Sequence, residues 1–310
     1  MSAFVHWVTS HPARTFLAAG MAAFLAFAAL PIAAWLPAGF VVLALLAGGP
    51  VAAGAAALGA ASVLLLVFAP ALGAGPALVI VIAVLLPSYL AASALTMTRS
   101  LSFVFQAVTV GAGLLVLAIH ALLGDPQGVL MPLIAQLEPM LRQTAETLSR
   151  FGIESSPQEI GAATARVAWA TLAWMVLLHA MLAQFAGLWA FGQMREPGLF
   201  GREFRRLRLG RLIAWIAIAA FGVSIGVQLA LGRSWQPADD LLFVLAAAFL
   251  VQALAVIHGL RDLQVIGLLP VILAYLAVVL VPMALVGIGF ADTWVHFRER
   301  FGRGAGGAGA

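Results

Sequence analysis

Few residues of this chain have side chains that could bind a ligand or take part in catalysis. Inside its long apolar segments the polar groups are amides and imidazoles, namely Gln106, His120, His179, Gln184, Gln228, Gln252 and His258. Burying such groups in a membrane costs free energy unless they are paired, so they mark candidate binding positions. We expect some of them to form a polar cavity for a small solute. The candidate ligand-binding residues are His179, Gln184, Gln228 and Gln252.

A purely structural role is the alternative for each of these side chains. His179 lies near the middle of a long predicted span, where a neutral imidazole bonded to a neighbouring helix would serve equally well. Gln228 and Gln252 either line the cavity or hold helices together. His120 and His258 lie near the ends of predicted spans, which favours positions at the membrane interface.

The residues that enzymes and metal sites need are missing or unsuitably spaced. The chain has no Cys, and its acids lie in predicted loops. Apart from His6 and His11 the histidines are far apart, and no pair has the i, i+4 spacing of a helical zinc motif. Gly48-Gly49-Pro50 has no following Lys and is not a phosphate-binding loop. We therefore expect no catalytic residue, no metal, no cofactor and no enzymatic activity.

The composition is that of an integral membrane protein. Hydrophobic residues make up 64% of the 310-residue chain, charged residues only 9%, and the mean hydropathy is +1.08. A soluble domain carries about 25% charged residues, and no soluble fold would bury this much apolar surface. The net charge of +4 comes from arginines at the ends of apolar segments, where they contact anionic lipid. It does not indicate a nucleic-acid partner.

One short segment sets the orientation in the membrane. Arg195–Arg211 holds six arginines and two glutamates, and the flanking segments 167–194 and 212–232 hold no Asp, Glu, Arg or Lys. A short Arg-rich loop between two spans marks the cytoplasmic face. We therefore place this loop, and the N-terminus with it, in the cytoplasm.

Pro and Gly divide the apolar segments into predicted spans at about 15–31, 37–49, 51–69, 75–96, 102–123, 167–194, 212–231, 241–259 and 263–289. A helix that begins at the capping box Ser156–Glu159 is expected to continue unbroken to about Met194. If 263–289 crosses once, the three arginines in 298–303 lie outside, against the positive-inside rule. The alternative, in which 263–289 does not cross once, gives eight spans. We favour nine spans over eight.

The predicted fold is all-α, a polytopic transmembrane helical bundle of 8–9 spans with an amphipathic extracytoplasmic helix. Apolar residues recur at helical spacing between Ile134 and Phe151, which indicates a helix on the outer interface. Four segments follow one another along the chain. They are an N-terminal membrane bundle of about five spans (1–124), the extracytoplasmic segment (125–159), a C-terminal membrane bundle with the Arg-rich loop (160–290), and a polar, partly disordered tail (291–310).

Two features are candidate contacts with lipid or a partner protein. The arginines of the loop surround Phe200, Phe204 and Leu207, which have the spacing of a short basic amphipathic helix. This helix either anchors the chain on anionic lipid or fits the groove of a partner. Alanines spaced by four residues in the first span form a small face for close contact, inside the chain or with a partner. The candidate partner- or lipid-binding residues are Ala18, Ala22, Ala26, Arg202, Arg205, Arg206 and Arg208.

Three segments resemble the YybS-like family of bacterial integral membrane proteins: FGREFRRLRLGRL (200–212), VQALAVIHGL (251–260) and GIGFADTWVHFRER (287–300). The resemblance covers most of the chain. It implies a multi-pass protein of the bacterial cytoplasmic (inner) membrane and supplies no catalytic residue.

A second, weaker likeness concerns LPIAAWLPAGFVVLALLAGGPVAAGAAALGA (30–60), which is similar to the start of the S components of energy-coupling-factor transporters. In those proteins a small-residue face on the first helix meets the coupling subunit, which implies the same role for Ala18, Ala22 and Ala26. This chain is longer and has more spans, and no ligand-binding residue can be matched.

We therefore predict a small-solute-binding, transport-related membrane subunit of the S-component kind. It would need a separate energy-coupling complex, because the chain has no nucleotide-binding motif of its own. The alternative is a membrane scaffold or assembly factor that holds its partners through the Arg-rich cytoplasmic loop and the outer helix of 126–155.

Overall fold

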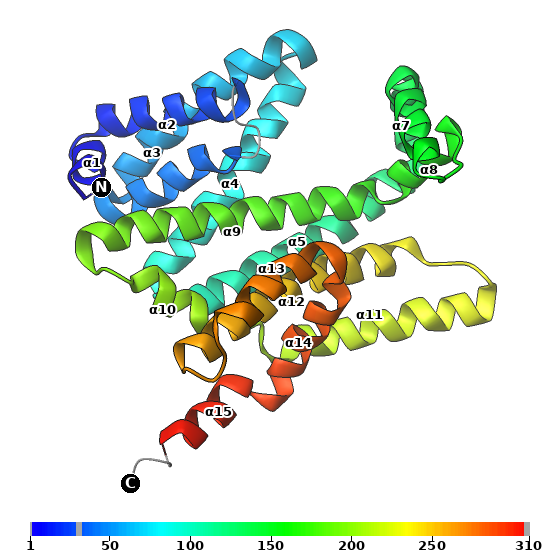
Figure 1. Cartoon of the computed structure of the whole chain (residues 1–310). Coiled ribbons are helices and arrows are strands. Elements are labelled where there is room, and N and C mark those ends of the chain that lie inside the picture. The colour runs from blue at the N-terminus through cyan, green and yellow to red at the C-terminus, as the bar shows by residue number, and fades with distance from the viewer. Residues whose placement is uncertain (1, 29–32, 307–310) are drawn as a thin grey trace. The chain divides into compact units, whose positions relative to one another are not determined.

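A computed structural model describes residues 2–28 and 33–306, and every regular element within them is a helix, as predicted. Figure 1 shows these helices coloured in chain order from blue to red. They are α1 (Ser2–Thr9), α2 (Pro12–Ala28), α3 (Leu36–Leu72), α4 (Ala74–Thr98), α5 (Leu101–Leu123), α6 (Pro126–Gln136), α7 (Glu138–Arg150), α8 (Pro157–Arg166), α9 (Ala168–Arg195), α10 (Leu199–Arg205), α11 (Gly210–Leu231), α12 (Gln236–Asp262), α13 (Leu268–Leu280), α14 (Pro282–Val295) and α15 (Phe297–Gly306).

Six of the described helices are long and apolar enough to cross a membrane, as expected of a multi-pass membrane protein. They are α3, α4, α5, α9, α11 and α12. The bent pair α13 and α14 makes a seventh if it is counted as one span. The predicted eight or nine spans are not confirmed, because α2 has only 17 residues and the predicted spans 37–49 and 51–69 both fall within α3. Residues 29–31 of the first predicted span lie outside the described residues.

The break predicted at Gly48-Gly49-Pro50 is present inside α3. Gly49 has φ 75° and ψ −169°, a backbone conformation that glycine adopts readily and other residues avoid. Pro50 has no N–H to donate, so it fits the first turn of the stretch that follows. Two helices therefore meet at Gly49 within α3.

The described helices group into two compact units, which we treat separately. Unit 1 comprises Met1–Val110, Val176–Ala214 and Ala246–Ala310, and unit 2 comprises Gly111–Met175 and Trp215–Leu245. Each unit combines segments that are distant in the sequence. The boundaries of the four consecutive segments predicted above therefore differ from the boundaries of these units.

Small residues bring helices of unit 1 into close contact. A Cβ atom added to Gly59 of α3 would lie 2.1 Å from the carbonyl oxygen of Phe16 in α2. One added to Gly187 of α9 would lie 2.5 Å from Cγ1 of Val42 in α3. The second half of α3 thus packs on α2 and its first half on α9, and a larger residue at either glycine would separate the helices.

Helices α13 and α14 form a hairpin and not a straight span. They have 13 and 14 residues, or roughly 20 Å each, and are bent by 118° relative to each other. Crossing the hydrocarbon core takes about 30 Å. Tyr275 Oη of α13 lies 2.9 Å from His258 Nε2 of α12, and a Cβ added to Gly289 of α14 would lie 1.9 Å from the carbonyl oxygen of Phe249. Both arms of the hairpin therefore pack on the second half of α12.

We use the name Arg loop for Arg195–Arg211. The hairpin returns the chain to the side of this loop. Nη1 of Arg298, which follows α14, donates to the carbonyl oxygen of Arg205 at 2.6 Å, and Glu299 pairs with Arg208 at 2.6 Å. The arginines after α14 therefore lie on the same side of the membrane as the Arg loop. This arrangement fits the alternative in which 263–289 does not cross once, and in that alternative the conflict with the positive-inside rule disappears.

The capping box predicted at Ser156 is present in unit 2. The Glu159 N–H donates to Ser156 Oγ at 3.2 Å, and Glu159 Oε2 accepts from the Ser156 N–H at 2.8 Å. The bond from the Ser156 backbone is the main cause of a lowered pKa of Glu159, because it favours the carboxylate. The helix that starts here ends at Arg166, and α9 begins only after Val167. The prediction of an unbroken helix to Met194 is therefore wrong.

The amphipathic helix predicted between 125 and 159 corresponds to α7. None of its residues is buried, and Met140 is 65% exposed. Arg142 and Glu138, one turn apart on its polar side, pair at 2.8 Å. A helix with exposed apolar residues and paired charges suits a membrane interface.

Gly289→Ala is expected to loosen the hairpin. The added methyl group would meet the backbone of Phe249, so we expect the free energy of unfolding to fall by about 1–3 kcal/mol or more. Gly287→Ala is the matched control, because nothing lies within 4 Å of its added Cβ and alanine favours the helix by about 1 kcal/mol. Thermal unfolding in detergent, followed by tryptophan fluorescence, compares the two. Equal midpoints would contradict the close contact between α12 and α14.

Cysteine labelling tests the topology of the hairpin, because the chain has no Cys of its own. Arg206→Cys and Arg300→Cys replace exposed side chains that the hairpin places on one side of the membrane. Both are expected to react with an impermeant maleimide from the same side of sealed vesicles. Ser149→Cys, which precedes the span α9, marks the other side. Labelling of Arg300→Cys from the same side as Ser149→Cys would mean that 263–295 crosses the membrane.

Candidate functional site

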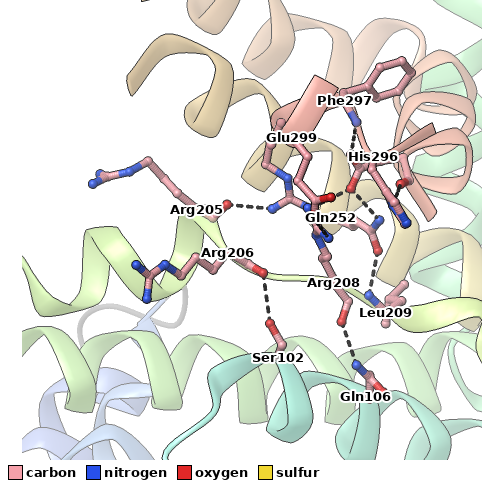
Figure 2. A network of polar contacts seen from close by, with 12 residues as sticks. Ser102, Gln106, Arg205, Arg206, Arg208, Leu209, Gln252, His296, Phe297 and Glu299 are labelled. Atoms are coloured by element: carbon pink, nitrogen blue, oxygen red, sulfur yellow. Dashed lines mark hydrogen bonds and ion pairs between the residues drawn. The ribbon is translucent and has the colours of Figure 1, made fainter. Parts of the chain in front are cut away.

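Unit 1 contains a network of buried polar side chains (Figure 2). Gln252 of α12 is fully buried; its Oε1 accepts from the Leu209 N–H at 2.8 Å, and its Nε2 donates to Asp292 Oδ2 at 3.2 Å. It thus joins the end of the Arg loop to α14. Gln252 is one of the predicted ligand-binding residues, yet the oxygen and the nitrogen of its side-chain amide both form hydrogen bonds within the protein.

Asp292 is the charged centre of this network. Its side chain has no solvent exposure, and Oδ2 also accepts from Nη2 of Arg298 at 2.6 Å. Oδ1 accepts from the Phe297 N–H at 3.1 Å. Arg298 is 9% exposed; burial lowers the pKa of its guanidinium, and Asp292 partly offsets this. Removing either partner would leave the other charge buried and unpaired.

Sequence reasoning missed this acid and one more. We expected no acid within the apolar helices and a polar tail from residue 291, but Asp292 lies inside α14. Asp240, expected in a loop, lies in α12, where Oδ2 is 2.8 Å from Nε2 of His120. His120, expected at the interface, is buried with it, and the two side chains are 8% and 7% exposed. The sequence feature that could have identified the two buried acids is the apolar residues beside each of them, in GFADTW and ADDLLF.

The Arg loop is held through its backbone. Figure 2 shows Ser102 donating to the carbonyl oxygen of Arg206 and Gln106 donating to that of Arg208, both at 3.0 Å. Leu207 and Leu209 of the loop are fully buried. The loop is therefore a fixed part of unit 1. Gln106 has the purely structural role that was given above as the alternative to a place in a ligand cavity.

The basic amphipathic helix predicted in the Arg loop corresponds to α10. Its Phe200 and Phe204 contact each other and Phe185 of α9, with ring centroids 5.4 to 5.7 Å apart. Phe204 also packs edge-on against His258 of α12. The apolar face of α10 thus packs inside the protein.

Each of the four predicted partner- or lipid-binding arginines pairs with a carboxylate. The pairs are Arg202–Glu196, Arg205–Asp262 (3.1 Å), Arg206–Glu203 (3.9 Å) and Arg208–Glu299 (2.6 Å). A cavity of about 340 Å³ opens beside these pairs, and we call it the basic cavity. It is lined by Arg202, Arg205, Arg206, Gly259, Asp262, Leu263, Arg298 and Glu299. With four guanidinium groups against two carboxylates, its lining is net positive.

A second cavity of about 390 Å³ is almost purely apolar, and we call it the apolar cavity. It lies among α1, α3, α9 and α10. Its aromatic lining residues are Phe4, Trp35, Phe40, Phe185, Trp189 and Phe200. Pockets for small molecules begin at about 300 Å³ and are mostly apolar, so this cavity has the size and lining of a binding site.

The other predicted ligand-binding residues line neither cavity. Gln184 of α9 is fully buried and donates to the carbonyl oxygen of Ser88 at 2.8 Å, while its Oε1 has no partner among the described residues. His179 Nε2 is likewise buried without a partner there. Gln228 is exposed and belongs to unit 2. The polar cavity around these residues stays a prediction, and residues 2–28 and 33–306 hold no His, Asp and Glu cluster placed for a metal ion.

The small-residue face of α2 lies inside the protein. Ala22 is 7% exposed, Ala26 is fully buried, and Ala18 is half-buried. The neighbouring Gly20 approaches α3 so closely that an added Cβ would lie 3.2 Å from the carbonyl oxygen of Gly59. This burial matches the alternative in which the alanines serve contact within the chain.

Asp292→Asn is expected to destabilise the protein strongly. It leaves the buried Arg298 without its counter-charge, which costs about 3–5 kcal/mol. Adding Arg298→Gln should recover part of the loss, since neither charge is then buried alone. Glu299→Gln is the control, because its pair with Arg208 is half exposed and contributes about 1 kcal/mol at most. Unfolding free energies complete a double-mutant cycle, and additive losses would contradict the buried pair.

Comparisons with known proteins supply no relative for this geometry. No protein-family model, no curated protein and no solved structure matches the chain. The resemblances to the YybS-like family and to S components therefore stay predictions.

Proposed function

We propose that this chain is a membrane subunit that binds a small apolar solute in the apolar cavity, as part of a transport system. The observation that carries the proposal is the convergence of aromatic side chains around about 390 Å³ of open space. Side chains that border an empty space lose packing contacts, and a bound apolar molecule restores them. The lining is almost free of polar groups, so the solute is apolar or presents an apolar part.

Small residues create this cavity. Gly39 of α3 and Ala186 and Ala190 of α9 lie in its lining among the aromatic rings. A Cβ added to Gly39 would lie 3.4 Å from the Cβ of Ala186, so the two helices already touch at this point. A bulky side chain on this part of α9 would therefore enter the cavity.

A transport role requires an energy-coupling partner, since the chain has no nucleotide-binding motif. The alanine face of α2 is buried and does not offer a docking surface. The opposite side of α2 exposes Leu17, Met21 and Phe24, which are 63%, 66% and 56% exposed. These residues follow helical spacing and form the surface of α2 that a membrane partner would contact.

The second candidate function is a scaffold that acts through the Arg loop. The segments 195–211, 258–264 and 292–306 together carry ten arginines and five acids, a net charge of +5 against +4 for the whole chain. The Arg206 side chain is 75% exposed and lies 3.9 Å from the carboxylate of Glu203. An acidic partner would find an accessible cationic surface here.

Native mass spectrometry of the detergent-purified protein tests the proposal. We expect a stoichiometric apolar small molecule on the wild-type chain. Ala190→Phe fills the cavity and should reduce solute binding at least about fivefold, since overfilling a packed site costs about 1 kcal/mol or more. Ala94→Phe in α4 is the matched control, because Ala94 is equally half-buried and lines neither cavity.

Two outcomes would contradict solute binding. One is a wild-type protein that carries only phospholipid, and the other is unchanged solute binding by Ala190→Phe. A co-purified protein without a small molecule, lost when the charge of Arg206 is reversed by Arg206→Glu, would favour the scaffold.

A further inference from the structure

The basic cavity offers more hydrogen-bond donors than its ion pairs use. A guanidinium group carries five N–H donors. In the contacts described, Arg202 uses two of them, to Pro197 and Glu196. Arg205 and Arg206 form ion pairs, with Asp262 at 3.1 Å and with Glu203 at 3.9 Å, and the longer of these is not a hydrogen bond. The lining therefore combines a net positive charge with further donors, which is what an anion requires.

Arg298 forms the buried wall of this cavity. Its Nη1 and Nη2 bond to the carbonyl oxygen of Arg205 and to Asp292, but its Nε is buried and has no hydrogen-bond partner among the described residues. A buried N–H without a partner costs free energy, so the guanidinium of Arg298 retains an unused donor in the wall of the cavity. A bound anion would also counteract the burial that lowers the pKa of Arg298.

The backbone of the loop and the side chain of Arg205 are positioned before any ligand arrives. Arg205 is fixed by the bond of its carbonyl oxygen to Arg298 and by the contact of its Nε with Asp262 at 3.1 Å. The backbone of Arg206 is fixed by Ser102. Figure 2 shows the side chains of Arg205 and Arg206 extending in the same direction from the loop. Binding therefore requires little reordering of the loop backbone and of Arg205.

We propose that the basic cavity binds a phosphate group. A carboxylate has two oxygens and a single charge, which one guanidinium satisfies. A phosphate offers three or four oxygens and up to two charges, which suits several guanidinium forks around one space. The group comes from a free phosphate or phosphate ester, or from the headgroup of an anionic lipid, since the Arg loop lies between two spans. This site is independent of the apolar solute.

Thermal unfolding of the full chain in dodecyl maltoside, a detergent without phosphate, tests this site. In one arm inorganic phosphate replaces chloride at constant ionic strength. In the other, dioleoyl phosphatidic acid replaces dioleoyl phosphatidylcholine in the micelles. A ligand of the folded state raises the unfolding midpoint as its concentration rises. We expect this rise in at least one arm, with a dissociation constant about tenfold or more weaker in Arg205→Gln and Arg206→Gln.

These two variants keep the backbone carbonyls that hold the loop, so they should fold. Arg142→Gln is the matched control, because Arg142 is also ion-paired, to Glu138, but lies in unit 2 outside the cavity. A rise with inorganic phosphate identifies free phosphates as ligands, and a rise with phosphatidic acid alone identifies a lipid headgroup. No rise in either arm, wild-type affinity in both cavity variants, or equal weakening by Arg142→Gln would overturn the proposal.

Discussion

The ion pair between Asp292 and Arg298 is the interaction on which the contacts among α12, α14 and the Arg loop depend. To form it, α14 ends at His296 in a left-handed conformation, φ 53° and ψ 53°, which is uncommon for a residue with a side chain. That turn allows the Phe297 N–H and the Arg298 guanidinium to reach back to one carboxylate. Gln252 then connects the same carboxylate to the Arg loop. Charge pairing thus offsets both the strained turn and the burial of the acid.

The two cavities differ in chemistry but share one short helix. Phe200 of α10 lines the apolar cavity, and Arg202 and Arg205 line the basic one. Their separation follows from the helical period, because residues two or five positions apart point to different sides of a helix. The position of α10 is set in turn by aromatic contacts with Phe185 and by the bond from Arg298. The geometry of both cavities therefore depends on the same few contacts.

Local features were predictable from the sequence, and distant contacts were not. The break at Gly49 and the capping box at Ser156 are set by residues within one turn, so their types alone indicate them. The partners of Asp292 are six residues away and, at Gln252, forty residues away, so no short motif identifies the pair. The apolar cavity likewise depends on side chains from four helices. The composition correctly indicated an apolar chain of helices, because apolar character is summed over all residues and does not depend on which residues contact each other.

The return of the hairpin to the side of the Arg loop has a consequence for biosynthesis. Once α12 is inserted, the chain that follows already emerges on the side where Arg298 and the later arginines remain. None of these guanidinium groups has to be translocated through the hydrocarbon core, where each would cost about 2.5–3.5 kcal/mol. The hairpin can therefore dock as a late step. Asp292 becomes buried when the hairpin docks, and Gln252 and Arg298 then donate hydrogen bonds to its carboxylate.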